Sequence, residues 1–136
     1  MDKVLQLLRE NMICCLATCS DDKPRASAME YVIAGDYILF ATDGDSIKAA
    51  NLRANNKISF SAHSMPQFVT IDGTTMEPSE AEINEYNRIL FDRHPEFKDM
   101  IAKGMMKPFT YFKLVPEVAY YNDYSNGMKP PEIIKM

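Results

Sequence analysis

Several segments of the chain alternate apolar and polar residues with a period of two, which is the pattern of half-buried strands. Residues 57–63 show it most clearly, because Ile58, Phe60 and Ala62 alternate there with polar side chains. A similar run over residues 67–78 contains a glycine at which the strand is expected to bulge or turn. Further β-rich runs predict strands over residues 11–20, 25–33, 37–42, 109–115 and 117–123.

The links between these runs contain typical turn residues. Residues 34–36 form a short link with a glycine between two β-rich runs, which predicts a hairpin. Pro116 is expected to separate the last two strands, and residues 125–136 have the composition of a loop.

Three segments have the helical period instead. Residues 1–11 place four apolar side chains on one face of a short amphipathic helix, and residues 46–55 predict a second helix. In residues 79–104, Ser79 and Glu82 have the spacing of a capping box, and apolar residues follow at helical intervals. A proline at position 95 is expected to interrupt this helix, and a glycine at position 104 is expected to end it.

This order of elements indicates an α+β fold. About six or seven short strands, with helices inserted between runs of neighbouring strands, favour an antiparallel sheet that closes into a small barrel. The β-α-β alternation of a doubly wound sheet is missing from the sequence, as is the G-x-G-x-x-G fingerprint. Because no repeat or boundary divides the chain, residues 1–136 are expected to form a single domain.

Composition narrows the classes of function. The chain is 46% hydrophobic and 25% charged, as globular domains are, and no apolar run approaches the roughly 20 residues of a membrane helix. Its formal charge of −4 argues against a nucleic-acid partner. The N-terminal segment lacks the pattern of a signal peptide, so we expect a cytoplasmic protein without membrane contact.

The sequence gives little support for a metal site or for thiol chemistry. The three cysteines, Cys14, Cys15 and Cys19, lie close together on one predicted strand, and their spacing matches no zinc pattern. The two histidines, His63 and His94, are not spaced as ligands, so no metal site is expected. Buried or half-buried thiols are the main interpretation of the cysteines, and a redox role is the alternative.

A lysine at the start of the helix over residues 46–55 is the first candidate for a site. Ser46 is placed as an N-cap, and Lys48 falls in the first turn, where free backbone N–H groups already create positive potential. This arrangement costs stability by itself and becomes favourable when an anion such as phosphate binds. The alternative is a solvated lysine whose side chain bends away.

A second cation is expected near the same place. Arg25 opens the strand of residues 25–33, and the predicted hairpin partner of this strand ends at Thr42, just before the helix. Guanidinium binds phosphate in a bidentate manner, and an ammonium adds a point charge. The alternative for Arg25 is an ion pair with one of the two aspartates that precede the strand.

The order of short motifs resembles one known family. A strand, "RASAME", a hairpin, "T-x3-S-x-K", "NL", "N-x-KISF" and "QFVTIDG" follow one another over residues 10–122. This order is similar to that of the FMN-binding split-barrel family of pyridoxamine 5'-phosphate oxidase-like proteins, and within it to the nitroimidazole-resistance and general-stress branches. The resemblance implies a six-stranded antiparallel split barrel, a homodimer, and one FMN in each interface groove.

The resemblance also assigns residues to the cofactor. The FMN phosphate would be held by the side chains of Arg25, Lys48, Thr42 and Ser46. The backbone that lines the flavin ring would come from Ala26, Ser27 and Ala28. These assignments place the whole phosphate site at the start of one helix and one strand.

Four further positions follow from the same resemblance. Glu30 stands where relatives often carry a lysine near the ring, and Ile47 stands where many carry an arginine beside the phosphate, so both departures remove positive charge. Gln67 falls near a glutamine that contacts flavin in relatives. Asn51 is a further candidate for the site, with a structural role at the loop as its alternative.

The function that this resemblance implies is that of an FMN-dependent oxidoreductase, similar to a flavin reductase or nitroreductase. Electrons would pass from a donor such as NAD(P)H through FMN to a small acceptor. Pyridoxamine-phosphate oxidase itself is disfavoured, because its C-terminal arginine motif has no counterpart after residue 122. The alternatives are a deazaflavin cofactor, a non-catalytic flavin- or haem-binding sensor, and a small barrel without a cofactor.

Overall fold

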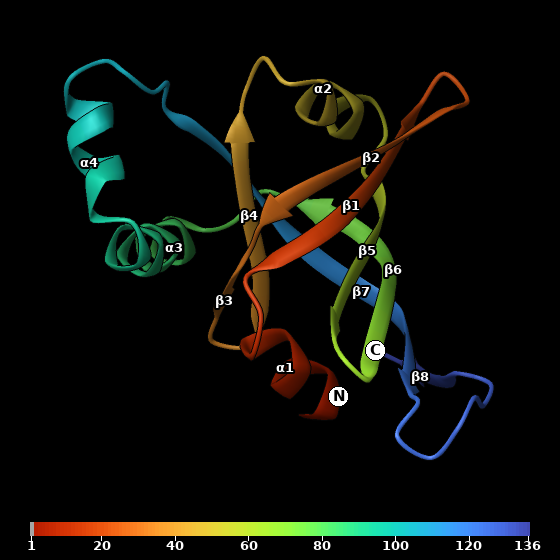
Figure 1. Cartoon of the computed structure of the whole chain (residues 1–136). Coiled ribbons are helices and arrows are strands. Elements are labelled where there is room, and N and C mark those ends of the chain that lie inside the picture. Colours follow the sequence, from red (N-terminus) through yellow and green to blue (C-terminus); the bar gives the residue numbers. More distant parts are fainter. Residues whose placement is uncertain (1) are drawn as a thin grey trace.

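The computed structural model describes residues 2–136, which form four helices and eight strands (Figure 1). The helices are α1 (Asp2–Arg9), α2 (Ile47–Ala54), α3 (Glu80–Arg93) and α4 (Pro95–Ala102). The strands are β1 (Ile13–Ser20), β2 (Lys23–Glu30), β3 (Val32–Ala34), β4 (Tyr37–Asp43), β5 (Lys57–Ser64), β6 (Gln67–Met76), β7 (Phe109–Asp123) and β8 (Glu132–Lys135). The expected number of six strands is therefore wrong.

All eight strands belong to one antiparallel sheet in the order β2-β1-β5-β6-β7-β4-β3, and β8 pairs with β7. The sheet curls into a split barrel with α2 over one end and α1 near the other, while α3 and α4 lie to one side (Figure 1). This arrangement confirms the predicted α+β class with an antiparallel barrel.

The β-rich run over residues 25–33 is two strands rather than one. It breaks at Tyr31, whose backbone N–H donates to Met12 O at 2.9 Å and whose hydroxyl donates to Leu8 O at 2.6 Å. Only β3 forms the predicted hairpin with β4, whereas β2 pairs with β1 at the opposite edge of the sheet. The strand of Arg25 is therefore not the hairpin partner of the strand of Thr42.

The C-terminal segment also differs from the sequence prediction. Residues 109–123 form the single strand β7, because Pro116 lies opposite Gly73, where the register of β6 shifts as predicted for a bulge. A side chain at Gly73 would collide with the carbonyl oxygen of Val115, so the close approach of the two strands requires glycine there. The tail predicted to be a loop contains β8, which pairs with residues 118–121 of β7.

Two apolar clusters hold the molecule together. The larger one fills the barrel and includes apolar residues of α1 and α2, among them Val4, Leu8 and Leu52. The smaller one joins Tyr86 and Leu90 of α3 to β3 and β4. These helices start and end as expected: Ser79 and Glu82 form the predicted capping box, and the chain leaves α3 at Arg93, two residues before Pro95.

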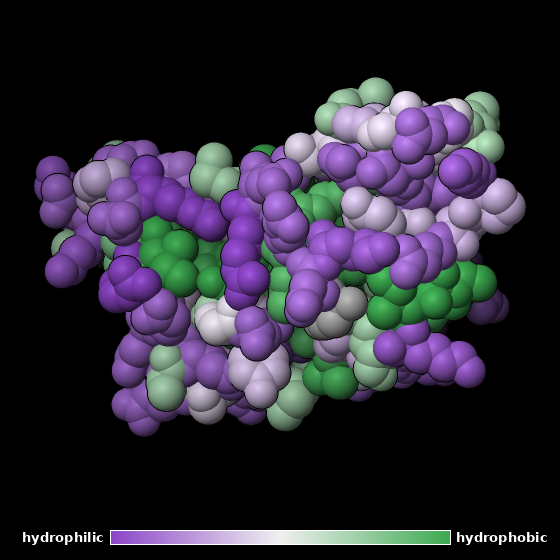
Figure 2. Space-filling view, turned by 90° about the horizontal axis from the view of Figure 1, so that it is seen from below, coloured by the Kyte–Doolittle hydropathy of each residue, from purple (hydrophilic) through white to green (hydrophobic). Residues whose placement is uncertain are grey.

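The face at the α1 end of the molecule is mostly polar. Figure 2 views the molecule from the α1 end, where hydrophilic side chains cover most of the surface and apolar groups form separate patches. None of the helices in residues 2–136 is long and apolar enough to cross a membrane.

Candidate functional site

The N-terminus of α2 presents unpaired backbone donors. Ser46 is the N-cap, and its Oγ accepts a hydrogen bond from Ala49 N at 3.2 Å and another from Thr42 Oγ1 at 3.2 Å. Within residues 2–136, the N–H groups of Ile47 and Lys48 have no hydrogen-bond acceptor. Because such groups carry the positive end of the helix dipole, this turn attracts an anion.

A cavity of about 300 Å³ lies beside this helix, and we call it the Arg25 cavity. Its lining comes from the β1–β2 turn and one face of α2, and consists of Ser20, Asp21, Lys23, Pro24, Arg25, Ile47 and Asn51. Arg25 is exposed and forms no ion pair with any residue from 2 to 136, so the expected alternative, a pair with a neighbouring aspartate, is not formed. A cationic side chain and the exposed face of α2 therefore share one cavity.

A buried hydrogen bond positions α2 against the barrel. Thr18 lies opposite Arg25 in the β1–β2 register, and it is only 3% exposed. Its Oγ1 accepts a hydrogen bond at 3.1 Å from Nδ2 of Asn51, the residue that also lines the Arg25 cavity. Asn51 thus attaches α2 to β1, and its contact with a cofactor stays a prediction. Sequence reasoning missed Thr18, although a polar residue at an inward-facing position of a strand requires a partner.

Lys48 is half-buried and has neither an ion pair nor a side-chain hydrogen bond with the described part of the chain. It follows Ile47, which lines the Arg25 cavity and is 55% exposed, but Lys48 itself is not among the lining residues. The structure therefore brings Arg25, Ile47 and Asn51 together, with Thr42, Ser46 and Lys48 at the adjacent start of α2. Binding of a phosphate by Arg25 and Lys48 together stays a prediction.

The outer face of β2 carries very small side chains, on the opposite side of the strand from Arg25. Ala26 and Ala28 are exposed and lie opposite Ala17 and Cys15 of β1, whereas Ser27 is half-buried and lies opposite the buried Leu16. A planar ring could approach the backbone of β2 closely on this face, because no large side chain of either strand separates the ring from the backbone.

Glu30 forms ion pairs at the end of β2. Its carboxylate accepts a hydrogen bond from Arg93 Nη1 at 3.1 Å and lies 2.8 Å from His94 Nε2. Arg93 also donates to the carbonyl oxygen of Tyr31 at 2.8 Å, and the ring of His94 stacks on Phe97. Glu30, which was expected near the flavin ring, is therefore bound to the junction of α3 and α4. Sequence patterns did not reveal this contact.

Gln67 lies away from the other candidates within one chain. It begins β6, and it lines a small cavity with Lys3, Gln6 and Glu10 beside α1. Because α1 and α2 are at opposite ends of the barrel in Figure 1, a single chain does not bring Gln67 to the Arg25 cavity.

The three thiols differ in their surroundings. Burial raises the pKa of Cys14 to about 12, so this thiol stays protonated. Cys15 is exposed on the outer face of β1, opposite Ala28, and Cys19 is half-buried. The expectation of buried or half-buried thiols is thus wrong for Cys15. Residues 2–136 contain no group of three side chains arranged to hold a metal ion.

Comparison with protein families identifies the class of this chain. Residues 1–123 match the family model described as pyridoxamine 5'-phosphate oxidase, so the chain belongs to this family. The resemblance seen in the order of the motifs is confirmed. No curated protein sequence matches the chain.

Solved structures with the same fold include three informative cases. General Stress Protein 26 from Bacillus anthracis has a TM-score of 0.73 at 18% identity, covering 99% of this chain and 97% of that chain. A haem-binding protein from Mycobacterium smegmatis has a TM-score of 0.75 at 18% identity, covering 95% of this chain and 55% of that one. An FAD-binding protein from Mesorhizobium loti has a TM-score of 0.68 at 16% identity, with coverages of 88% and 89%. These likenesses show the split-barrel fold.

Proposed function

We propose that the protein is an FMN-binding oxidoreductase that passes electrons from a reduced donor such as NAD(P)H to a small acceptor. The observation that carries this proposal is the Arg25 cavity. There a guanidinium with no ion pair to residues 2–136 lies beside α2, whose first-turn N–H groups have no acceptor in the same range. Membership of the pyridoxamine 5'-phosphate oxidase family supports it, as does the similarity to an FAD-binding protein.

The residues present fit a flavin mononucleotide. Arg25, Lys48 and the N–H groups of α2 would neutralise its phosphate, while Thr42 and Ser46 would supply hydroxyl groups. The small side chains at Ala26 and Ala28 leave room for the flavin ring along β2. Bound flavin would supply the redox chemistry, and the chain would bind and orient it.

The proposal includes a homodimer with FMN at the interface. Ile13, at the start of β1, is 58% exposed, and the neighbouring Met12 is 48% exposed, beside the small side chains of β1 and β2. A second copy on this face would bury these apolar groups and close the flavin groove. A cytoplasmic location belongs to the same proposal, because the donor is a reduced nicotinamide nucleotide.

The test begins with the absorbance spectrum of the freshly purified full chain. We expect flavin bands, or quenching of added FMN fluorescence with saturation at one FMN per chain, and bleaching by NADPH under nitrogen. Light scattering of the FMN-loaded protein should give the mass of a dimer. A colourless protein that does not quench FMN fluorescence would refute the flavin site, and a monomeric mass would refute the shared groove.

A second candidate is a non-catalytic haem- or flavin-binding protein, favoured by the similarity to the mycobacterial haem-binding protein. The same spectrum separates the two, because haem gives a Soret band and flavin does not. Flavin that stays oxidised with every nicotinamide donor would favour the non-catalytic alternative. A deazaflavin cofactor would be recognised by its blue-shifted absorbance.

A further inference from the structure

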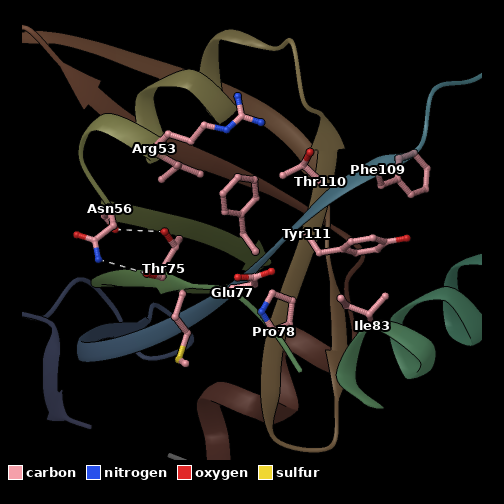
Figure 3. Close-up of a pocket in the computed structure, with 12 residues that line it drawn as sticks. Arg53, Asn56, Thr75, Glu77, Pro78, Ile83, Phe109, Thr110 and Tyr111 are labelled. Carbon is pink, nitrogen blue, oxygen red and sulfur yellow. Dashed lines mark hydrogen bonds between the residues drawn. The ribbon is translucent and has the colours of Figure 1, made fainter. Parts of the chain in front are cut away.

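A second cavity lies on the other side of α2, and we call it the Arg53 cavity. It has a volume of about 480 Å³ and lies between the C-terminal end of α2, the end of β6, the start of β7 and the first turns of α3 (Figure 3). It shares no lining residue with the Arg25 cavity. Its volume is in the range of cavities that hold small organic molecules.

One wall of the Arg53 cavity is the open edge of a strand. Residues 109–112 of β7 pair with β4, but β6 pairs with β7 only from Lys113 onward. Beyond Met76, the chain turns away through Glu77 and Pro78 into α3. The cavity therefore occupies the space where a neighbouring strand would otherwise continue, and its backbone polar groups face that space.

Two polar side chains converge at the upper end of this cavity in Figure 3. Arg53 Nη1 donates to Gly44 O at 2.8 Å, which fixes the guanidinium. A side-chain carbon built at Gly44 would lie 2.9 Å from Thr110 Oγ1 and 3.3 Å from Arg53 Nη2, so both groups approach the same point. A planar acceptor such as a carboxylate matches a guanidinium and a hydroxyl presented side by side.

Arg53 has no carboxylate partner in the described part of the chain. The nearby Asp45 is bound by Lys107 Nζ at 2.6 Å, and this contact lowers the pKa of the Asp45 carboxyl. The Nη2 and Nε hydrogens of Arg53 have no acceptor among residues 2–136, and neither does the hydroxyl of Thr110. A cation and a hydroxyl therefore remain available for a ligand.

Apolar side chains form the middle of the cavity. Phe112, Leu52, Pro78 and Ile83 line the cavity and form its apolar wall. Glu77 lies across the cavity from Arg53 in Figure 3 and forms no ion pair or hydrogen bond with the rest of residues 2–136. Its carboxylate would repel a second negative charge at that end of a ligand.

From this geometry we infer that the Arg53 cavity binds a small amphipathic monocarboxylate. Its carboxylate would accept hydrogen bonds from Arg53 and Thr110, and its apolar body would lie against Phe112 and Ile83. Glu77 would exclude dicarboxylates of similar length. The Arg53 cavity shares no lining residue with the Arg25 cavity, although Thr110 is the cross-strand partner of Thr42.

Calorimetric titration of the full chain with 3-phenylpropanoate tests the inference. We expect saturable binding at one site per chain. Binding of 3-phenylpropan-1-ol should be at least tenfold weaker, because the alcohol loses a charge-assisted hydrogen bond, and binding of adipate should be at least tenfold weaker, because Glu77 repels its second carboxylate. Arg53→Gln should weaken phenylpropanoate binding by about tenfold and Thr110→Val by about threefold. Glu77→Gln should leave phenylpropanoate affinity within about twofold and improve adipate binding by about fivefold.

The controls separate this site from others. Arg53→Lys keeps the charge and should retain part of the affinity, whereas Arg25→Ala should change phenylpropanoate affinity by less than about twofold. If Arg53→Gln does not fold, the affinities of Thr110→Val and Glu77→Gln still test the site. Changes in the amide NMR shifts of residues 109–112 on adding phenylpropanoate test it as well. Absence of saturation at millimolar phenylpropanoate, equal affinity for the alcohol, or loss of binding in Arg25→Ala would each overturn the inference.

Discussion

Cationic side chains on the two sides of the barrel differ in whether they have a carboxylate partner. Beside α3, Arg93 pairs with Glu30, and Lys113 Nζ lies 2.8 Å from Glu82 Oε2 with both side chains less than one-fifth exposed. Beside α2, Arg25 and Lys48 have no carboxylate partner among residues 2–136. Among residues 2–136, Arg93 and Lys113 thus have carboxylate partners, whereas Arg25 and Lys48, near the start of α2, have none.

This difference is expected if the paired charges stabilise the fold and the unpaired ones bind the proposed anion. A half-buried cation without a partner is unfavourable, and so is a lysine in the first turn of a helix. On the α3 side the pairs attach helices to strands far away in sequence. On the α2 side, Arg25 and Lys48 form no such pair with residues 2–136, which is expected of a site whose partner is a bound anion.

The largest effect on FMN binding is expected when both unpaired cations are removed. Arg25→Ala with Lys48→Ala should weaken FMN binding by about 3–6 kcal/mol, from about 1.5–3 kcal/mol for each charge-assisted hydrogen bond. The free energy of unfolding of the apoprotein should change by less than about 0.5 kcal/mol, as for surface substitutions. Fluorescence titration and urea unfolding measure the two quantities.

The single variants serve as the control for this pair. If both side chains act on one phosphate, their effects on FMN affinity should depart from additivity by more than about 0.5 kcal/mol. Additive or negligible effects would contradict a shared phosphate site.

The converse change is to break a paired cation. Glu82→Gln keeps a residue able to close the capping box at α3 but removes the charge opposite Lys113. We expect a loss of about 1–2 kcal/mol in the free energy of unfolding, because the half-buried Lys113 loses its carboxylate partner and keeps only the ring of Tyr37, 3.8 Å from its Nζ. FMN affinity should stay unchanged. A weaker FMN affinity without loss of stability would contradict a purely structural role for this ion pair. Urea unfolding and FMN titration of the same variant decide between the two.

The pH dependence of stability sharpens the same contrast. Hydrogen bonds from Lys113 and from the backbone N–H of Ser79 hold the pKa of Glu82 below its ordinary value of 4.5. A carboxyl with a lowered native pKa stabilises the fold fully above its unfolded pKa and loses this contribution as the pH falls through its native pKa. Unfolding free energies measured from about pH 6 to pH 3 should therefore converge between wild type and Glu82→Gln at the acid end. A difference that stays constant over this range would exclude titration of Glu82 as the cause.

The smallest expected effect concerns a hydroxyl beside the unpaired cations. Thr42→Val removes the donor to Ser46 while preserving the shape of the side chain. We expect FMN binding to weaken by about 0.5–1.5 kcal/mol, the net contribution of one hydrogen bond. Fluorescence titration measures it, with Thr70→Val on β6 as a matched control that should leave FMN affinity unchanged.

Local patterns predicted the local elements well. The four apolar positions of α1, the capping box of α3 and the bulge at Gly73 depend on residues near one another in sequence, and each is present. The break at Tyr31 was missed, because alternation continues through it and only contacts with α1 and β5 show that it turns the chain. The uninterrupted β7 was missed because Pro116 meets a bulge that belongs to another strand.

The candidate site was predictable only in part. A lysine in the first turn of a helix is visible in sequence, and so is an arginine at the start of a strand. The sequence predicted that a hairpin would bring Arg25 beside α2. The structure brings them together differently, because α2 packs on β1 through the hydrogen bond between Asn51 and Thr18, and Thr18 lies opposite Arg25. The pairs of Glu30 with Arg93 and His94 join residues more than 60 positions apart, which no local pattern encodes.

The break at Tyr31 has a consequence for how the barrel resists unrolling. The two outermost strands of the sheet, β2 and β3, are consecutive in sequence and separated by this one fully buried residue. A covalent link therefore joins the two borders where β2 ends and β3 begins, and at that point they stay within the reach of one residue. The main chain thus closes the barrel there, although β2 and β3 are not hydrogen-bonded to each other.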